Sequence, residues 1–332
     1  MTTISRRDWL KYLGALTAGG VVANVSGCAA PKRKLVVTAG AWPGYEPLFL
    51  ARHQGWLDPE QIRLGEVPSN ASSIYALATG VADAAALTLD EVLMLRSQGI
   101  ALTIVLVFNI SAGADMLLAR PEMGSLAELK GKRVAIEQGT YAPLLLDTAL
   151  AAAGLRRADV TTVHLPIGDQ MPAWRKGEID AAVTYAPFAD ELVAAGAHRL
   201  FDSRQMPDTI VDVLAVRNES LSAGGGDALR HLLAAHFRTL AFLADAPDDA
   251  ARLIGARRRS EAVAVASAYD GLILPDLEKN RRLLAGRAPV LQEKARLIGE
   301  AMRRAGVLSG SDDLNGLVNG DYLPASGKEG ER

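Results

Sequence analysis

The chain has 332 residues, 49% of them apolar, with 36 Lys or Arg, 38 Asp or Glu and a net charge of −2. This length and apolar content suffice for two modest hydrophobic cores. The near balance of charge, without a clustered basic face, excludes an electrostatic nucleic-acid binder. A single cysteine excludes a disulfide within the chain, so its stability must come from core burial.

The first 27 residues have the order of an export signal. A basic start containing Arg6 and Arg7 precedes a modestly apolar run over residues 13–25 and a small-residue end before Cys28. The apolar run is too short and too rich in Gly and Ala to remain as a membrane-spanning helix. The basic start resembles a twin-arginine signal, with Trp9 where Phe is usual, and export by the Sec route is an equal alternative.

The only cysteine, Cys28, ends a Val-Ser-Gly-Cys motif that resembles a bacterial lipobox. The resemblance implies cleavage before Cys28 and a diacylglycerol on its sulfur, which would anchor the protein to a membrane in the periplasm or at the cell surface. A small buried core cysteine is the alternative. Residues 1–27 hold three of the 36 basic and one of the 38 acidic residues, so their removal leaves 33 and 37, a net charge of about −4. Residues 28–33 would form a tether.

Two segments of the chain recur at a nearly constant distance. The sequence YEPLFL at 45–50 returns as YAPLLL at 141–146, and GVADAA at 80–85 returns as GEIDAA at 177–182. Each copy follows a short apolar, β-prone run, so each predicts a strand, a loop, a helix and a second strand. The sequence therefore predicts two related α/β lobes that face each other across a ligand-binding crevice.

Two strand-like runs, at 116–119 and 210–217, are the predicted crossovers between the lobes, and together they would form a hinge. A triple-glycine break at 224–226 begins a mainly helical C-terminal tail. The predicted limits are 34–117 plus 214–324 for the first lobe, 118–213 for the second lobe, and 325–332 for a charged, frayed end.

Four motifs together resemble the solute-binding lipoproteins of bacterial ABC importers: WPGYEPL at 42–48, SLAELKGKRVA at 125–135, and the two Gly-x-x-Asp-Ala-Ala turns. The nearest branch includes proteins that bind nitrate, taurine, aliphatic sulfonates and thiamine precursors. The resemblance covers residues 34–220 well and the tail loosely. It implies a type II periplasmic-binding fold, a monomer that closes on a small-molecule ligand and docks on an ABC permease, with no cofactor.

The residues give no independent sign of catalysis. The five histidines are scattered without metal-ligand spacing, and neither a Gly-x-Ser-x-Gly elbow nor a phosphate-binding loop is present. We therefore expect no enzyme and no metal site. An exported enzyme stays an alternative, because a pyrimidine synthase and a menaquinone-pathway dehydratase share the fold, although the synthase depends on a Cys-rich motif that this chain lacks. A binding protein that serves a sensor is the other alternative.

Four loops are expected at the cleft, and they contain four aromatic residues but no Lys, Arg or His. Aromatic faces and carboxylates attract cations, so an amine-bearing or zwitterionic ligand is expected. A sulfonate or nitrate held by helix N-termini is the alternative. The candidate ligand-binding residues are Trp42, Tyr45, Glu46, Thr88, Asp90, Asp115, Glu137, Thr140, Tyr141, Thr184, Tyr185 and Asp212.

Several of these carboxylates have structural alternatives. Glu46 precedes a predicted helix and would favour its dipole, and Asp90 would cap the helix that follows it. Asp83 and Asp180 lie in the repeated turns and are predicted to form them. Asp212 stands alone in an apolar strand, where it either faces the ligand or pairs within the structure.

Overall fold

The computed structural model describes residues 33–138, 140–259, 262–286, 289–304, 306–308, 310 and 314–325, without the side chains of 262–264. The export signal, Cys28 and most of the tether lie outside these residues. None of the helices in the described ranges is long and apolar enough to cross a membrane. From residue 34 onward, the described residues pack as one unit that contains two lobes.

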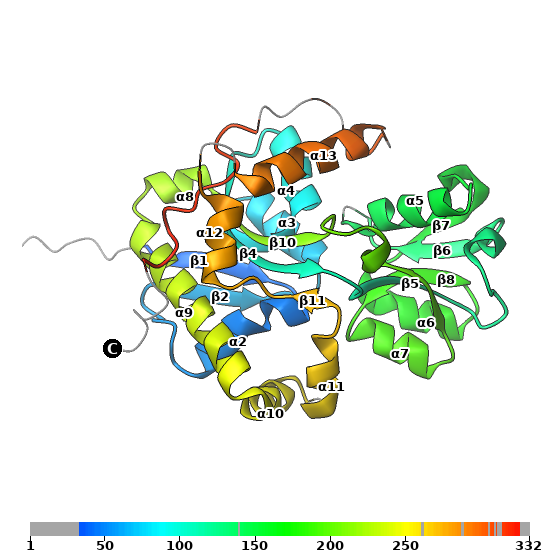
Figure 1. Cartoon of the computed structure of the whole chain (residues 1–332), viewed down its shortest axis with the longest axis horizontal. Helices are drawn as coiled ribbons and strands as arrows, with labels where there is room; N and C mark the ends of the chain where they lie inside the picture. The colour runs from blue at the N-terminus through cyan, green and yellow to red at the C-terminus, as the bar shows by residue number, and fades with distance from the viewer. Residues whose placement is uncertain are drawn as a thin grey trace, which may run out of the picture. The chain divides into compact units, whose positions relative to one another are not determined.

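The first lobe is built on a mixed six-stranded sheet with the order β11-β4-β10-β3-β1-β2 (Figure 1). Strand β1 pairs in parallel with β2 and β3, whereas β10 runs antiparallel to both β3 and β4. The strands are β1 (Leu35–Ala39), β2 (Ile62–Glu66), β3 (Ala84–Thr88), β4 (Leu102–Ser111), β10 (Val211–Arg217) and β11 (Leu272–Ile273).

The second lobe, green in Figure 1, is built on a mixed sheet with the order β7-β6-β8-β5-β9. Strand β6 pairs in parallel with β7 and β8, and β5 pairs antiparallel with β8 and β9. The strands are β5 (Asp115–Ala119), β6 (Arg133–Ile136), β7 (Thr161–His164), β8 (Ala181–Tyr185) and β9 (His198–Asp202).

Helices cover both sheets, and the C-terminal helices return to the first lobe, where α9 packs on α2, α12 on β4 and α13 on α4. The helices of the first lobe are α2 (Glu46–His53), α3 (Asn70–Ala78), α4 (Leu89–Ser97), α8 (Asn218–Ser222), α9 (Gly226–Asp245), α10 (Pro247–Arg258), α11 (Ala262–Ala268), α12 (Leu277–Leu284) and α13 (Val290–Arg304). Those of the second lobe are α5 (Ala142–Ala152), α6 (Gln170–Arg175) and α7 (Phe188–Ala194).

The sequence repeat corresponds to the same local structure in both lobes. Helices α2 and α5 each begin with a proline in the first turn, where its missing N–H costs no hydrogen bond. In the repeated turns, Asp83 accepts a hydrogen bond from the Val36 N–H (2.8 Å), and Asp180 accepts one from the Arg133 N–H (2.9 Å). Each aspartate therefore ties its turn to the strand that begins its copy of the repeat, β1 in the first lobe and β6 in the second.

The chain passes from one sheet to the other about three residues earlier than the predicted lobe limits. Residues 116–119 lie inside β5, which pairs along its length with β8, and residues 211–217 form β10, which pairs with β3 and β4. The connections between the sheets are therefore 112–114 on the outward path and 203–210 on the return. The predicted lobe limits, 118 and 213, fall three residues inside β5 and β10, because the apolar run of a strand does not mark where the chain changes sheets.

Candidate functional site

A small cavity lies between the two lobes, at the hinge-side ends of both sheets. Its free volume is about 10 Å³, which is the room of about one water molecule. Its lining residues come from both lobes: Trp42, Asn70, Thr88, Asp115, Tyr141, Tyr185, Ile210 and Asp212. The structure therefore brings together six of the twelve candidate residues, and it adds Asn70 and Ile210, which the sequence did not single out.

Three helix N-termini meet this cavity. Asn70 is the first residue of α3, and Thr88 and Tyr141 are the residues that precede α4 and α5. The first turns of α3 and α5 carry no acidic residue, whereas that of α4 carries Asp90 and Glu91. The N-termini of α3 and α5, one from each lobe, therefore retain the partial positive charge that attracts anions.

Aromatic rings form the walls of the cavity and cross from one lobe to the other. Trp42 of the first lobe meets Tyr185 of the second edge to face, with ring centroids 5.1 Å apart. The Tyr185 ring centroid also lies 6.4 Å from that of Tyr141 and 5.8 Å from that of Phe188, both in the second lobe. The Trp42–Tyr185 contact between the lobes belongs to a closed arrangement, so a ligand larger than water enters when the lobes separate.

The carboxylate of Asp212 is held by buried neutral donors. The Tyr45 hydroxyl donates to Oδ1, and the Asn109 amide nitrogen donates to Oδ2 at 2.9 Å, while the Asn109 oxygen accepts from Trp42 Nε1 at 3.1 Å. Burial raises the pKa of Asp212 well above its usual value, as does the nearby charge of Asp115, and the Tyr45 hydrogen bond opposes this. The sequence analysis did not single out Asn109, although it is the only amide side chain in the mostly apolar strand β4.

Asp115 starts β5 and faces the same cavity from the second lobe. It is 2% exposed, and burial raises its pKa to about 6 against weaker opposing hydrogen bonds from Ser111 and Tyr141. Asp115 and Asp212 therefore bring two carboxyl groups from opposite lobes to one cavity. None of the eight lining residues is Lys, Arg or His, so these carboxyl groups have no basic partner in the lining.

A further acidic pair lies at the start of α4. Burial raises the pKa of Asp90 to about 6. Burial and the neighbouring charge of Asp90 raise the pKa of Glu91 well above its usual value. Glu91 Oε2 accepts a hydrogen bond from the Thr88 N–H (2.8 Å), so Glu91 caps the helix. The Thr88-x-x-Glu91 spacing of a capping box was the sequence signal for Glu91.

Three candidates lie near the cavity without lining it. Glu137 is 7% exposed, and burial raises its pKa against opposing hydrogen bonds from the Ile167 backbone and Ser69. The Thr140 hydroxyl donates to the Glu137 carbonyl (3.0 Å) and accepts from the Ala142 N–H (3.3 Å), so it shapes the start of α5. Thr184 is fully buried on β8, and its hydroxyl has no partner among the described residues.

Glu46 lies outside the cavity lining. Its carboxylate is 1% exposed and accepts from Arg257 at 2.5 Å on each oxygen and also from Arg258, both on α10. It instead borders a separate cavity with Pro43 and Pro187. The Glu46 carboxylate is therefore paired with two arginines, and the sequence analysis did not predict this ion pair.

The raised pKa of Asp115 predicts a pH dependence of stability. Asp115 has a pKa of about 6 in the folded protein against an ordinary value of 3.8, so the folded state binds its proton more tightly than the unfolded state. Its contribution to the free energy of unfolding is therefore largest below about pH 4 and is lost as the pH rises through 6. The difference is on the order of 3 kcal/mol. We expect Asp115→Asn to flatten the fall in the free energy of unfolding between pH 4 and 7, measured by urea titration.

The matched control for this prediction is Asp147→Asn, on the surface of α5, where the carboxylate pairs with Arg157 at 2.7 Å. That variant should keep the wild-type slope. Parallel profiles for wild type and Asp115→Asn would contradict a raised pKa at Asp115.

Two mixed α/β sheets joined by two crossovers, with a cavity between them, define the type II periplasmic-binding fold. Among solved structures, the alkanesulfonate-binding protein SsuA from Xanthomonas axonopodis pv. citri, bound to MOPS, is similar with a TM-score of 0.71 and 18% identity, over 85% of this chain and 96% of that one. The desulfurization enzyme DSZB is similar with a TM-score of 0.62 and 17% identity, over 88% and 98%. At these identities the likeness establishes the fold alone.

The chain matches the NMT1-like family over residues 28–256, which is more than half of its length, and it belongs to that family. The taurine-binding periplasmic protein of Escherichia coli K12 is 27% identical over 154 residues, 46% of this chain and 48% of that protein. The chain spans less than half the length of the curated relatives it matches. Among the described residues, no group of three or more His, Cys, Asp or Glu side chains is arranged to hold a metal ion.

Proposed function

We propose that this protein is an extracytoplasmic solute-binding protein that delivers a small amine-bearing or zwitterionic molecule to an ABC importer. One observation carries the choice of ligand: Asp115 and Asp212 face one cavity from opposite lobes, and no basic residue lines that cavity. Membership in the NMT1-like family and the taurine-binding relative support the transport role.

The two carboxylates also suggest why ligand binding and lobe closure are coupled. When the lobes meet without a cation, burial and, after it, the charge of Asp115 raise the pKa of Asp212, so keeping both carboxyl groups ionised in the closed site is unfavourable. An ammonium group between them pairs with both and offsets their repulsion. Closure is then stabilised by the ligand, as transport by a solute-binding protein requires.

A zwitterion would also interact with the helix N-termini at the site. The N-termini of α3 and α5 carry no acidic residue in their first turns and meet the cavity from opposite lobes. They suit the sulfonate or carboxylate end of a zwitterion while Asp115 and Asp212 hold its amine. The aromatic walls formed by Trp42 and Tyr185 then cover the short apolar part.

A purely anionic sulfonate is the second candidate, and a putative aliphatic sulfonates-binding protein of Escherichia coli K12, 28% identical over 128 residues, supports it. Such a ligand would be held by helix N-termini and hydroxyl groups with the acidic residues protonated. The raised pKa values of Asp115 and Asp90, both about 6, make that protonation accessible in mildly acidic medium. Anion binding that strengthens below pH 6 would favour this candidate over a zwitterion.

The proposal predicts a solute that closes the protein. Protein purified without refolding should carry a nitrogen-containing solute in native mass spectrometry, and its removal should raise the radius of gyration in small-angle scattering. Returning the solute, or adding taurine, should lower the radius and raise the melting temperature in proportion to ligand excess over Kd. An unchanged radius at saturating solute would contradict a closing binding protein, and a retained solute without nitrogen would contradict the ligand class.

Membrane anchoring through Cys28 is part of the same proposal, although Cys28 lies outside the described residues. We expect Cys28→Ser to release the protein from the membrane fraction of its host, because the acyl chains attached at that position would be lost. Wild-type protein should show a mass shift of a lipid at a mature N-terminus that begins at residue 28. Wild-type protein that retains residues 1–27 in its host would argue against the anchor.

A further inference from the structure

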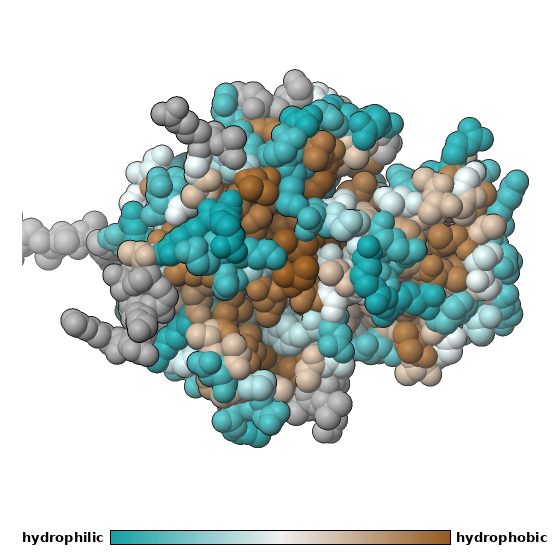
Figure 2. Space-filling view, in the orientation of Figure 1, coloured by the Kyte–Doolittle hydropathy of each residue, from teal (hydrophilic) through white to brown (hydrophobic). Residues whose placement is uncertain are grey.

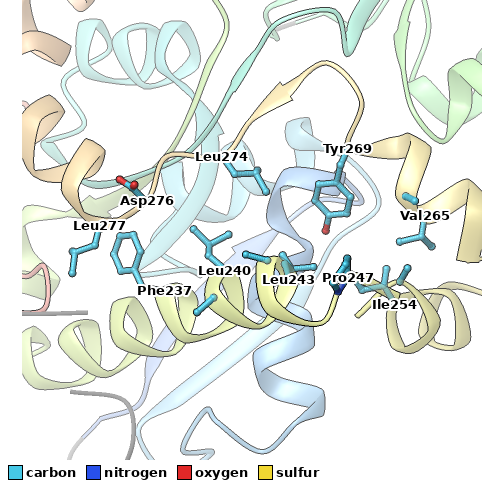
Figure 3. Close-up of a pocket in the computed structure, with 14 residues that line it drawn as sticks. Phe237, Leu240, Leu243, Pro247, Ile254, Val265, Tyr269, Leu274, Asp276 and Leu277 are labelled. Atoms are coloured by element: carbon cyan, nitrogen blue, oxygen red, sulfur yellow. The ribbon is translucent and has the colours of Figure 1, made fainter. Parts of the chain in front are cut away.

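A second and larger cavity, of about 610 Å³, lies in the first lobe between α9, α10, α11 and the segment from β11 to α12 (Figure 3). None of its lining residues borders the cavity between the lobes. Of its 14 lining residues, 12 are apolar, and the others are Tyr269 and Asp276. Figure 2 shows apolar side chains gathered on this face of the molecule, around the hollow between α9 and the β11–α12 segment.

The size of the cavity suits a small organic molecule. Ligand pockets commonly have volumes of about 300–1,000 Å³. An apolar cavity of roughly 150 Å³ holds one benzene molecule, so this cavity has room for a hydrocarbon body of roughly 10–20 carbon atoms. The cavity walls offer such a body leucine, isoleucine and phenylalanine side chains along α9 and α10, as Figure 3 shows.

The charge of the lining selects against ions. No Lys, Arg or His is among the described lining residues, and the two arginines whose charge reaches Tyr269, Arg257 and Arg258, are already paired with Glu46. An acid such as a fatty acid would therefore have to compete with Glu46 for a cationic partner. Asp276, at the rim, accepts a hydrogen bond from the Lys279 N–H (2.7 Å) as the cap of α12 and adds negative charge near the opening. An uncharged molecule is therefore favoured over an anionic one.

One polar atom in the wall has no partner. The hydroxyl of Tyr269 is shielded from solvent and forms no hydrogen bond among the described residues. In Figure 3 the Tyr269 ring lies across from α9, and its hydroxyl points into the cavity toward Leu243, Pro247 and Ile254, which offer it no side-chain acceptor. A buried unpaired hydroxyl is unfavourable, and a ligand that supplies a hydrogen-bonding group at this point would satisfy it.

We propose that this cavity is a second ligand site, which binds one uncharged molecule with a hydrocarbon body and a single hydroxyl or carbonyl group paired with the Tyr269 hydroxyl. The inference goes beyond the proposed transport function and does not depend on it. The two sites differ in chemistry, since the cavity between the lobes is lined by carboxyl groups and this one by aliphatic side chains.

The test uses the fluorescence of N-phenyl-1-naphthylamine, which rises in apolar surroundings. The full mature protein should bind one equivalent saturably, and 1-decanol should displace the probe at least tenfold more effectively than decanoate. Ala251→Trp, which fills the cavity from α10, should abolish the signal. Val193→Trp is the matched control, since Val193 is exposed on α7 of the other lobe, and it should bind like the wild type.

Two further variants keep the proposal open to refutation. Should Ala251→Trp fail to melt cooperatively, Ala244→Trp fills the same cavity from α9. Tyr269→Phe should weaken 1-decanol about fivefold while leaving displacement by naphthalene unchanged, because one hydrogen bond is lost and the apolar contacts remain. Absence of saturable probe binding in the wild type, undiminished binding in a folded tryptophan variant, or equal displacement by decanoate would each overturn the proposal.

Discussion

Asp115→Asn is expected to weaken the binding of taurine or choline by roughly 100-fold, because it neutralises a carboxylate that would pair with the ligand's positive nitrogen inside a closed site. Breaking such a buried charge pair costs about 2–5 kcal/mol. Ethanesulfonate, which carries no amine, is expected to bind more tightly to the variant than to the wild type, since a nearby negative charge is removed. Calorimetric titration of the three compounds against both proteins measures the change and its sign.

Asp147→Asn removes an equal charge from a partly exposed residue of the same lobe that does not line the cavity, so it controls for the change in net charge. Affinities for all three compounds should stay within about twofold of wild type in that variant. If the best-binding compound is an anion without nitrogen, and its affinity rises in Asp115→Asn, the sulfonate alternative replaces our preferred ligand class.

Gly44→Ala is expected to destabilise the protein and to impair ligand binding together. A Cβ at position 44 would lie 1.9 Å from the end of the Asn109 amide and 2.7 Å from Trp42 Nε1. Asn109 is fully buried and holds Asp212, so it has no free space into which to move. Forcing an atom into such a site costs typically 1–3 kcal/mol, which urea unfolding would detect, and the displaced Asp212 should lower the affinity of any amine-bearing ligand.

Gly168→Ala is the matched control, because Gly168 has no positive φ and a Cβ there would meet no atom within 4 Å. Its unfolding free energy should stay close to that of the wild type. A Gly44→Ala variant as stable as Gly168→Ala, with unchanged ligand affinity, would show that Asn109 is not constrained as described.

The sequence predicted the features that depend on neighbouring residues. The paired lobes followed from repeats that encode a strand, a helix start and a turn within about 50 residues, and Asp83 and Asp180 indeed have equivalent places in the two turns. Clustering of Trp42, Tyr141 and Tyr185 followed from the rule that strand-end loops of paired lobes face each other.

The remaining features depend on contacts between distant parts of the chain, and no local pattern encodes them. Glu46 has the local setting of a ligand-binding loop, yet its partners lie more than 200 residues away on α10. The role of Asn109 requires β4 to lie beside the loop that contains Trp42 and Gly44. The limits of the hinge were missed because strand-forming sequence does not mark which sheet a strand joins.

The narrow cavity between the lobes has a kinetic consequence. With free volume for about one water molecule, a bound solute has no exit path while the lobes touch. Its residence time is then limited by how often the segments 112–114 and 203–210 let the lobes part. Substitutions in those two segments, other than at Ile210, which lines the cavity, should change the dissociation rate without altering any atom that touches the solute. The timing of release can therefore evolve separately from ligand choice.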